Sequence, residues 1–247
     1  MATKKLLITI LILCATPLLM AQEHFNKGVQ AFEEGEFENA TNYFHAHVED
    51  FPLDYVGYYN LGNAYYKQKK YPHALWAYEK TLKINPRYND AIFNAKLSYD
   101  RAGLVGEWKH STSMISQLLF GVQKNAWAII TLLFSSTLAI TLFLMFTTTR
   151  VTLKRILFLV TGICIFIVST ALILALMHKS HLTTENKGVI IIATANAKVA
   201  PNSESRTLFS IPGGQKVQLL REQEDWIEVQ ISAENVGWLK KEDLRKF

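Results

Sequence analysis

Cysteine is scarce in this sequence of 247 residues, which contains only two. Cys14 lies in an apolar segment near the N-terminus, and Cys164 lies in another apolar segment far along the chain. Two cysteines in such places do not form a disulfide framework, so the class of small disulfide-stapled proteins is excluded.

Catalytic and metal-binding motifs are also missing. There is no Gly-x-Ser-x-Gly element, no phosphate loop, no dinucleotide fingerprint and no zinc-protease helix motif. His45 and His47 point to different faces of a helix, and the pair His178 and His181 fits a solvated membrane boundary better than a metal site. We therefore expect no catalytic residue, no metal and no cofactor, because an enzyme would need chemistry without a recognisable motif.

A surface for nucleic acid is not expected either, although the formal charge is +5. From residue 22 to 106 there are nine basic and eleven acidic residues, and from 188 to 247 there are eight of each. The excess lies in an N-terminal leader and in a short segment at Arg150, Lys154 and Arg155. No basic stripe remains to follow a phosphate backbone.

Two segments have no Asp, Glu, Lys or Arg at all, namely residues 126–149 and 156–177. Each is long enough to cross a hydrocarbon core of about 30 Å as a helix. We predict two transmembrane helices joined by a loop at 150–155. The absence of charge at membrane depth argues against a transporter and favours an anchor.

Residues 1–21 have the order of a signal peptide, with Lys4 and Lys5, an apolar run and Ala21 before a cleavage point. An uncleaved anchor is the alternative, because Leu19 is larger than the usual small residue. Export of the N-terminal region and a cytoplasmic basic loop agree on one topology. We expect a two-pass membrane protein with both flanking domains on the outer side of the membrane.

The segment 104–125, just before the first span, has apolar residues at helical spacing. It includes Ile115, Leu119 and Val122. An interfacial helix and a segment packed under the preceding domain are both compatible with this pattern.

A period of 34 residues runs through the N-terminal region, the length of a tetratricopeptide repeat. Five pairs of residues recur at this offset: Gly28 and Gly62, Phe37 and Tyr71, Ala40 and Ala74, Phe44 and Tyr78, and Pro52 and Pro86. Small residues allow close helix crossing, aromatics fill the gap and proline ends the second helix. We predict an all-α repeat domain over 22–103, with repeats at 21–54 and 55–88 and a capping helix at 89–101.

The two repeats resemble those of the tetratricopeptide family, whose first helices line a concave groove where partner proteins bind. This resemblance places six candidate contacts in the second repeat and the cap: Tyr59, Asn63, Tyr66, Lys67, Phe93 and Leu97. Asn63 is also a frequent consensus residue, so a structural role competes with a binding role. The first repeat is acidic and the second basic, which would orient a partner or draw the two hairpins together.

After a hinge at 178–187, the sequence changes to short β-branched runs separated by turns, such as Pro212-Gly213-Gly214. Five strands are expected, at 189–194, 208–211, 216–220, 226–231 and 237–239. This pattern of strands and turns predicts a small all-β antiparallel barrel over residues 188–247.

The order of short motifs in this segment, from Val199-Ala200-Pro201 to Val236-Gly237-Trp238, resembles bacterial Src-homology-3-like domains. Such domains bind cell-wall peptides or proteins, which makes Trp226 and Trp238 candidate ligand contacts. Packing is the competing role for each tryptophan. Ala200 departs from the arginine common in that family.

The whole arrangement of leader, repeats, two spans and barrel resembles the BatE-type proteins of the Bacteroidetes aerotolerance operon. The resemblance implies a multidomain protein of a bacterial inner membrane, with both flanking domains in the periplasm. It would act as a scaffold beside von Willebrand factor A-type proteins and a MoxR-type ATPase in oxygen or envelope stress. A tether that binds peptidoglycan through the barrel is the alternative function.

Overall fold

The computed structural model describes residues 23–106, 108 and 126–247. Two compact units are present, one made of the residues up to His110 together with Glu185–Phe247, and the other of Ser111–Thr184. The predicted signal peptide and nearly all of the predicted interfacial helix lie outside the described residues.

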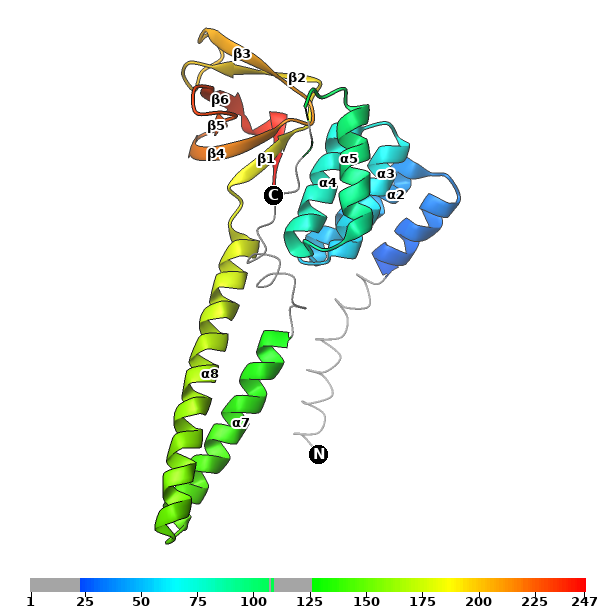
Figure 1. Cartoon of the computed structure of the whole chain (residues 1–247). Coiled ribbons are helices and arrows are strands. Elements are labelled where there is room, and N and C mark those ends of the chain that lie inside the picture. Colours follow the sequence, from blue (N-terminus) through cyan, green and yellow to red (C-terminus); the bar gives the residue numbers. More distant parts are fainter. Residues whose placement is uncertain (1–22, 107, 109–125) are drawn as a thin grey trace, which may run out of the picture. The chain divides into compact units, whose positions relative to one another are not determined.

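Antiparallel helices form the N-terminal part of the first unit (Figure 1). Residues 23–33 are helical and are followed by α2 (Phe37–Asp50), α3 (Tyr55–Lys67), α4 (Tyr71–Ile84) and α5 (Asn89–Arg101). Each of the four labelled helices packs against the next one along the chain. The bounds of α5 coincide with those predicted for the capping helix.

The 34-residue period has a direct structural meaning in these hairpins. A Cβ atom on Gly62 would lie 2.6 Å from Cε1 of Tyr78, and one on Gly28 would lie 2.7 Å from Cε1 of Phe44. Both rings are fully buried, so they cannot move aside. Each repeat therefore needs glycine on its first helix wherever its second helix carries the aromatic ring.

The turn between α2 and α3 is held by Asp54. One carboxylate oxygen of Asp54 accepts a hydrogen bond from the backbone N–H of Val56 at 3.1 Å and caps α3. The other lies 2.7 Å from Nε2 of His47 on α2. A single side chain thus fixes both the start of α3 and its attachment to α2.

The C-terminal part of the first unit is an antiparallel sheet of seven strands. Its strands are β1 (Lys187–Ile190), β2 (Thr194–Lys198), β3 (Thr207–Pro212), β4 (Lys216–Gln223), β5 (Trp226–Gln230), β6 (Val236–Lys240) and β7 (Leu244–Lys246). The order is β3-β2-β6-β5-β4-β1-β7. Because β3 and β7 are the two ends of this order, the sheet does not close, and the expectation of a closed barrel is wrong.

Strands β2 and β7 were not among the five expected strands. The sequence of β2, Thr-Ala-Asn-Ala-Lys, has only one β-branched residue. Its two alanines are fully buried, and a Cβ atom on Gly237 of β6 would lie 3.0 Å from Cβ of Ala197. Close approach of β2 and β6 therefore selects small side chains, which hide the strand from a search for β-branched residues.

The second unit contains a hairpin of two apolar helices, α7 (Ala126–Thr147) and α8 (Val151–Thr183), which pack against each other (Figure 1). The most apolar stretches have mean hydropathies of 2.3 and 2.8, and both helices are long and apolar enough to cross a membrane. Thr161 of α8 donates a hydrogen bond of 3.2 Å to Thr141 of α7 inside the hairpin.

The ends of α8 differ from the sequence prediction. The helix begins at Val151, so Lys154 and Arg155 lie in its first turns and not in a loop. Lysine and arginine are good helix formers, and their stems can lie along apolar surface while their charges reach a polar boundary. At the other end α8 continues to Thr183, so most of the expected hinge is helical.

Candidate functional site

The six residues predicted to contact a partner lie on α3 and α5, the first helices of the second repeat and of the cap. We call the surface that these six residues form the first-helix surface. Asn94 of α5 joins the two helices, because its side-chain N–H₂ donates to Oδ1 of Asn63 at 3.1 Å and to the hydroxyl of Tyr59 at 3.3 Å. The structure therefore joins two of the predicted residues of α3 to the helix that carries Phe93 and Leu97.

Asn63 has a structural role on this surface. Its Oδ1 also accepts a hydrogen bond of 2.8 Å from the hydroxyl of Tyr78, which is fully buried on α4. Burial raises the pKa of Tyr78, so this phenol stays a neutral donor. Asn63 thus links α3, α4 and α5. Asn94, its partner, is not among the six predicted residues. It lies 34 positions after Asn60, so the repeat period was the signal that could have found it.

Tyrosine rings pack beside this amide network. The ring of Tyr59 lies 5.9 Å from that of Tyr78 and 5.0 Å from that of Tyr88, which in turn lies 5.3 Å from Tyr55. Burial is the main cause that raises the pKa of Tyr88, and the neighbouring Tyr59 is the second. Tyr78 is fully buried in this cluster, whereas Tyr55, Tyr59 and Tyr88 are half-buried at its edge.

Phe93 and Lys67 are the most accessible members of the first-helix surface. The side chain of Phe93 is 68% exposed, and Lys67 is exposed at the end of α3. Leu97 is half-buried, and the ring of Tyr66 packs 5.4 Å from that of Tyr71. An exposed aromatic ring next to fixed amide and phenol groups is a typical composition for a protein-binding surface.

The repeat helices and the sheet pack into one another within the first unit. Val189 of β1 and the terminal Phe247 belong to the same hydrophobic cluster as the buried residues of the repeats. The indole N–H of Trp76 on α4 donates to the backbone carbonyl of Lys246 on β7 at 2.8 Å. The two regions were predicted as separate domains, and their shared core was not visible in the sequence.

Glu79 of α4 is the centre of a polar contact in this interface. It is only 6% exposed, and its Oε1 accepts from the indole N–H of Trp108 at 2.9 Å and pairs with Nζ of Lys216 on β4 at 3.0 Å. The ammonium group of Lys216 lies 5.3 Å from the ring centre of Trp108. A buried carboxylate is tolerated here because two donors share it.

A cleft of about 430 Å³ lies beside this interface, between the repeat helices and β7. It is lined by His45, Val48, Glu49, Pro52, Tyr58, Trp76, Lys80, Glu185, Lys241, Leu244, Arg245 and Lys246. Most of its cations are already paired, Lys80 with Glu185 and both Lys241 and Lys246 with Glu222. The pairing leaves little net charge to select an anionic ligand.

The two tryptophans predicted as ligand contacts of the C-terminal region differ in accessibility. Trp226 is half-buried on the face of β5 opposite the buried Ile227. Trp238 is only 7% exposed, and the guanidinium of Arg221 covers its ring at 5.4 Å. Arg221 is held in place by two hydrogen bonds to Glu228. Trp226 is therefore the better placed of the two to touch a ligand.

No group of three or more His, Cys, Asp or Glu side chains that could hold a metal occurs in the part of the chain that the structure describes. A comparison with curated proteins gave no match to the chain. Residues 55–88, which form α3 and α4, match the tetratricopeptide repeat family. The matched segment carries four of the six residues of the first-helix surface.

Proposed function

We propose that this protein is a membrane-anchored adaptor that binds a partner protein through its first-helix surface and performs no catalysis of its own. The observation that carries the proposal is the exposed ring of Phe93 on α5, next in sequence to Asn94, whose amide is hydrogen-bonded to Asn63 of α3. Tetratricopeptide repeats are protein-interaction elements, and the match over 55–88 supports the same use here. Fixed amides would orient a peptide backbone, and the exposed ring would supply apolar contact.

The proposed topology places the turn between α7 and α8 in the cytoplasm and both flanking regions in the periplasm. Arg150, Lys154 and Arg155 at the turn support the cytoplasmic side. The shared core of the repeats and the sheet supports the rest, because two regions that pack together must lie on the same side of the membrane. An even number of spans meets that requirement.

The proposed setting is a complex for tolerance of oxygen or envelope stress, as the resemblance to BatE-type proteins implies. Partners would then be membrane proteins with von Willebrand factor A-type domains. The C-terminal sheet would act as a Src-homology-3-like module that is fixed to the repeats and so widens the surface presented to a partner.

A photo-crosslinking amino acid at position 93, in the full chain in intact cells, tests the adaptor proposal. We expect a defined crosslinked partner, which should also bind the purified full chain and lose at least tenfold in affinity with Phe93→Ser. The same crosslinker at Leu53 is the matched control, because Leu53 is also an exposed apolar residue of the repeats. Equal binding by wild type and Phe93→Ser would overturn the assignment of this surface.

A tether that binds peptidoglycan through the sheet is the second candidate function, and the half-buried ring of Trp226 on the outer face of β5 favours it. Purified full chain in detergent should then sediment with isolated sacculi, and Trp226→Ala should reduce the bound fraction. Phe93→Ser should sediment like wild type. Absence of co-sedimentation would exclude the tether and leave the adaptor proposal unaffected.

A further inference from the structure

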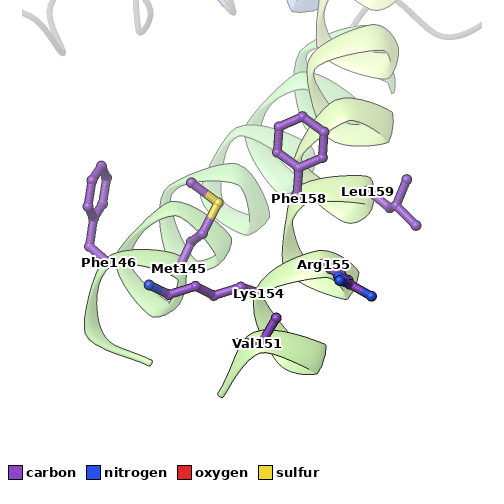
Figure 2. Close-up of a pocket in the computed structure, with 7 residues that line it drawn as sticks. All are labelled: Met145, Phe146, Val151, Lys154, Arg155, Phe158 and Leu159. Carbon is purple, nitrogen blue, oxygen red and sulfur yellow. The ribbon is translucent and has the colours of Figure 1, made fainter. Parts of the chain in front are cut away.

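An open pocket of about 590 Å³ lies at the turn of the helical hairpin, between the end of α7 and the start of α8 (Figure 2). It is lined by Met145, Phe146, Val151, Lys154, Arg155, Phe158 and Leu159. The lining is almost entirely apolar apart from the ends of the two basic side chains. Neither the repeats nor the sheet supplies any of these residues.

The lining residues of α8 follow helical spacing over its first turns. Counted from Val151, the other four lie three, four, seven and eight positions later: Lys154, Arg155, Phe158 and Leu159. With a rise of 1.5 Å per residue, Phe158 lies about 6 Å farther along the helix axis than Lys154. The positive charges are therefore near the turn, and the apolar side chains continue from them toward the middle of the helix.

The two basic side chains flank the pocket in different directions. Figure 2 shows Lys154 extending toward the end of α7, near Met145 and Phe146, while Arg155 points to the other side of α8. The sequence has no Asp or Glu between Glu107 and Glu185, so no acidic residue of the hairpin itself neutralises them. An occupant of opposite charge is favoured at this end of the pocket.

The apolar part of the pocket requires an occupant with a hydrocarbon portion. Phe146 is 82% exposed, and Phe158 and Leu159 are also exposed. In a hairpin that crosses a membrane, these side chains face acyl chains, whereas Lys154 and Arg155 reach the level of the headgroups. A small soluble anion would satisfy the charges and leave the apolar walls uncovered.

We propose that this pocket binds one anionic phospholipid. The phosphate group lies at the side chain of Lys154, with Arg155 adding positive charge at the same end of α8, and an acyl chain lies along Phe146 and Phe158. This inference rests on the proposed crossing of the membrane by α7 and α8. It adds a function to the anchor, because the basic turn then selects the lipid that surrounds it as well as the side of the membrane on which it lies.

Native mass spectrometry of the full chain in detergent tests the proposal by titration with two lipids that have identical acyl chains. We expect phosphatidylglycerol to bind more tightly than phosphatidylethanolamine. A basic residue near a membrane surface contributes about fivefold to binding of anionic lipid, so Lys154→Gln with Arg155→Gln should weaken phosphatidylglycerol binding roughly 30-fold. Phosphatidylethanolamine also has a phosphate group, but its own ammonium group offsets that charge, so its binding should weaken much less.

Lys179→Gln is the matched control, because Lys179 is an exposed lysine near the opposite end of α8. We expect it to leave phosphatidylglycerol binding unchanged, whereas Phe158→Ala should weaken the binding of both lipids. Glycerol phosphate, which carries the anionic group without acyl chains, should not compete at equal concentration.

Three results would overturn the proposal: equal affinity for the two lipids, no effect of the double glutamine variant, or competition by glycerol phosphate, which would indicate a soluble anion. A chain that alkaline carbonate extracts from membranes would instead refute the membrane anchor itself. Partner crosslinking at position 93 does not depend on the lipid, so the two proposals fail separately.

Discussion

Substitution of Glu79 by alanine should separate the sheet from the repeat helices or weaken their contact severely. Glu79 is the only acidic residue of the second repeat, and it is buried between Trp108 and Lys216. Its removal deletes the hydrogen bond that the indole N–H of the buried Trp108 donates to it. It also removes the negative charge that faces the ammonium group of Lys216.

The structure allows the size of this effect to be estimated. A hydrogen bond to a charged group contributes about 1.5–3 kcal/mol. The side chain of Lys216 is 30% exposed and regains some hydration, so its bond counts at the low end of that range. The sum is about 3 kcal/mol, which corresponds to a fall in Tm of roughly 6–12 °C for a unit of this size. Glu79→Gln keeps the shape and an acceptor, and should cost about half as much.

Thermal unfolding of the full chain in detergent, followed by tryptophan fluorescence, measures the effect directly, because Trp76 and Trp108 both lie in the interface. The control is Glu49→Ala. Glu49 lines the neighbouring cleft, but its side chain is 72% exposed and pairs with His45 on its own helix. Its loss should change the free energy of unfolding by less than about 0.5 kcal/mol.

The reasoning is refuted if Glu79→Ala lowers Tm by less than 2 °C, or if Glu49→Ala lowers it by as much. Either outcome would mean that the polar contact does not hold the sheet on the repeats.

Two further predictions concern the repeat helices. Gly62→Ala would place a methyl group 2.6 Å from Cε1 of the buried Tyr78. We expect the free energy of unfolding, measured by thermal unfolding, to fall by about 1–3 kcal/mol. A Tm equal to that of an exposed Lys96→Ala control would contradict this. Burial, and next the charge of Lys70, lowers the pKa of His73 below 6.5 in the folded protein. The unfolded chain therefore binds the proton more readily than the folded chain. The contribution of His73 to stability is complete above pH 6.5 and is lost as the pH falls toward the pKa of the folded state. His73→Gln should therefore flatten the fall in Tm between pH 7 and 5, and an unchanged slope would count against it.

Much of the repeat region could be predicted because its determinants are local and periodic. The offset of 34 residues pairs Gly62 with Gly28 and Tyr78 with Phe44, and the same spacing makes each glycine meet its aromatic ring in the folded hairpin. The two apolar segments were found by the absence of charge alone. The residues on the first helices followed from their repeat positions, and the role of Asn94 as a bridge did not.

Prediction was weaker wherever neighbours across the sheet decide the structure. Strand β2 is built from small residues because β6 approaches it closely at Gly237. Strand β7 is only three residues long, and it pairs with β1, which lies more than 50 residues earlier in the sequence. The open order of the seven strands also depends on pairings between distant segments, which no local pattern specifies.

The sequence by itself determined the helical repeat, the two apolar helices and the presence of β structure after them, because periodicity and hydrophobic runs act over a few turns of chain. Only the tertiary structure decided that the repeats and the sheet share one core. Trp76 meets the carbonyl of Lys246 across 170 residues, and Glu79 becomes buried only when Lys216 and Trp108 arrive together. A contact of this kind depends on the shapes of two complete surfaces, and these exist only after each part has folded.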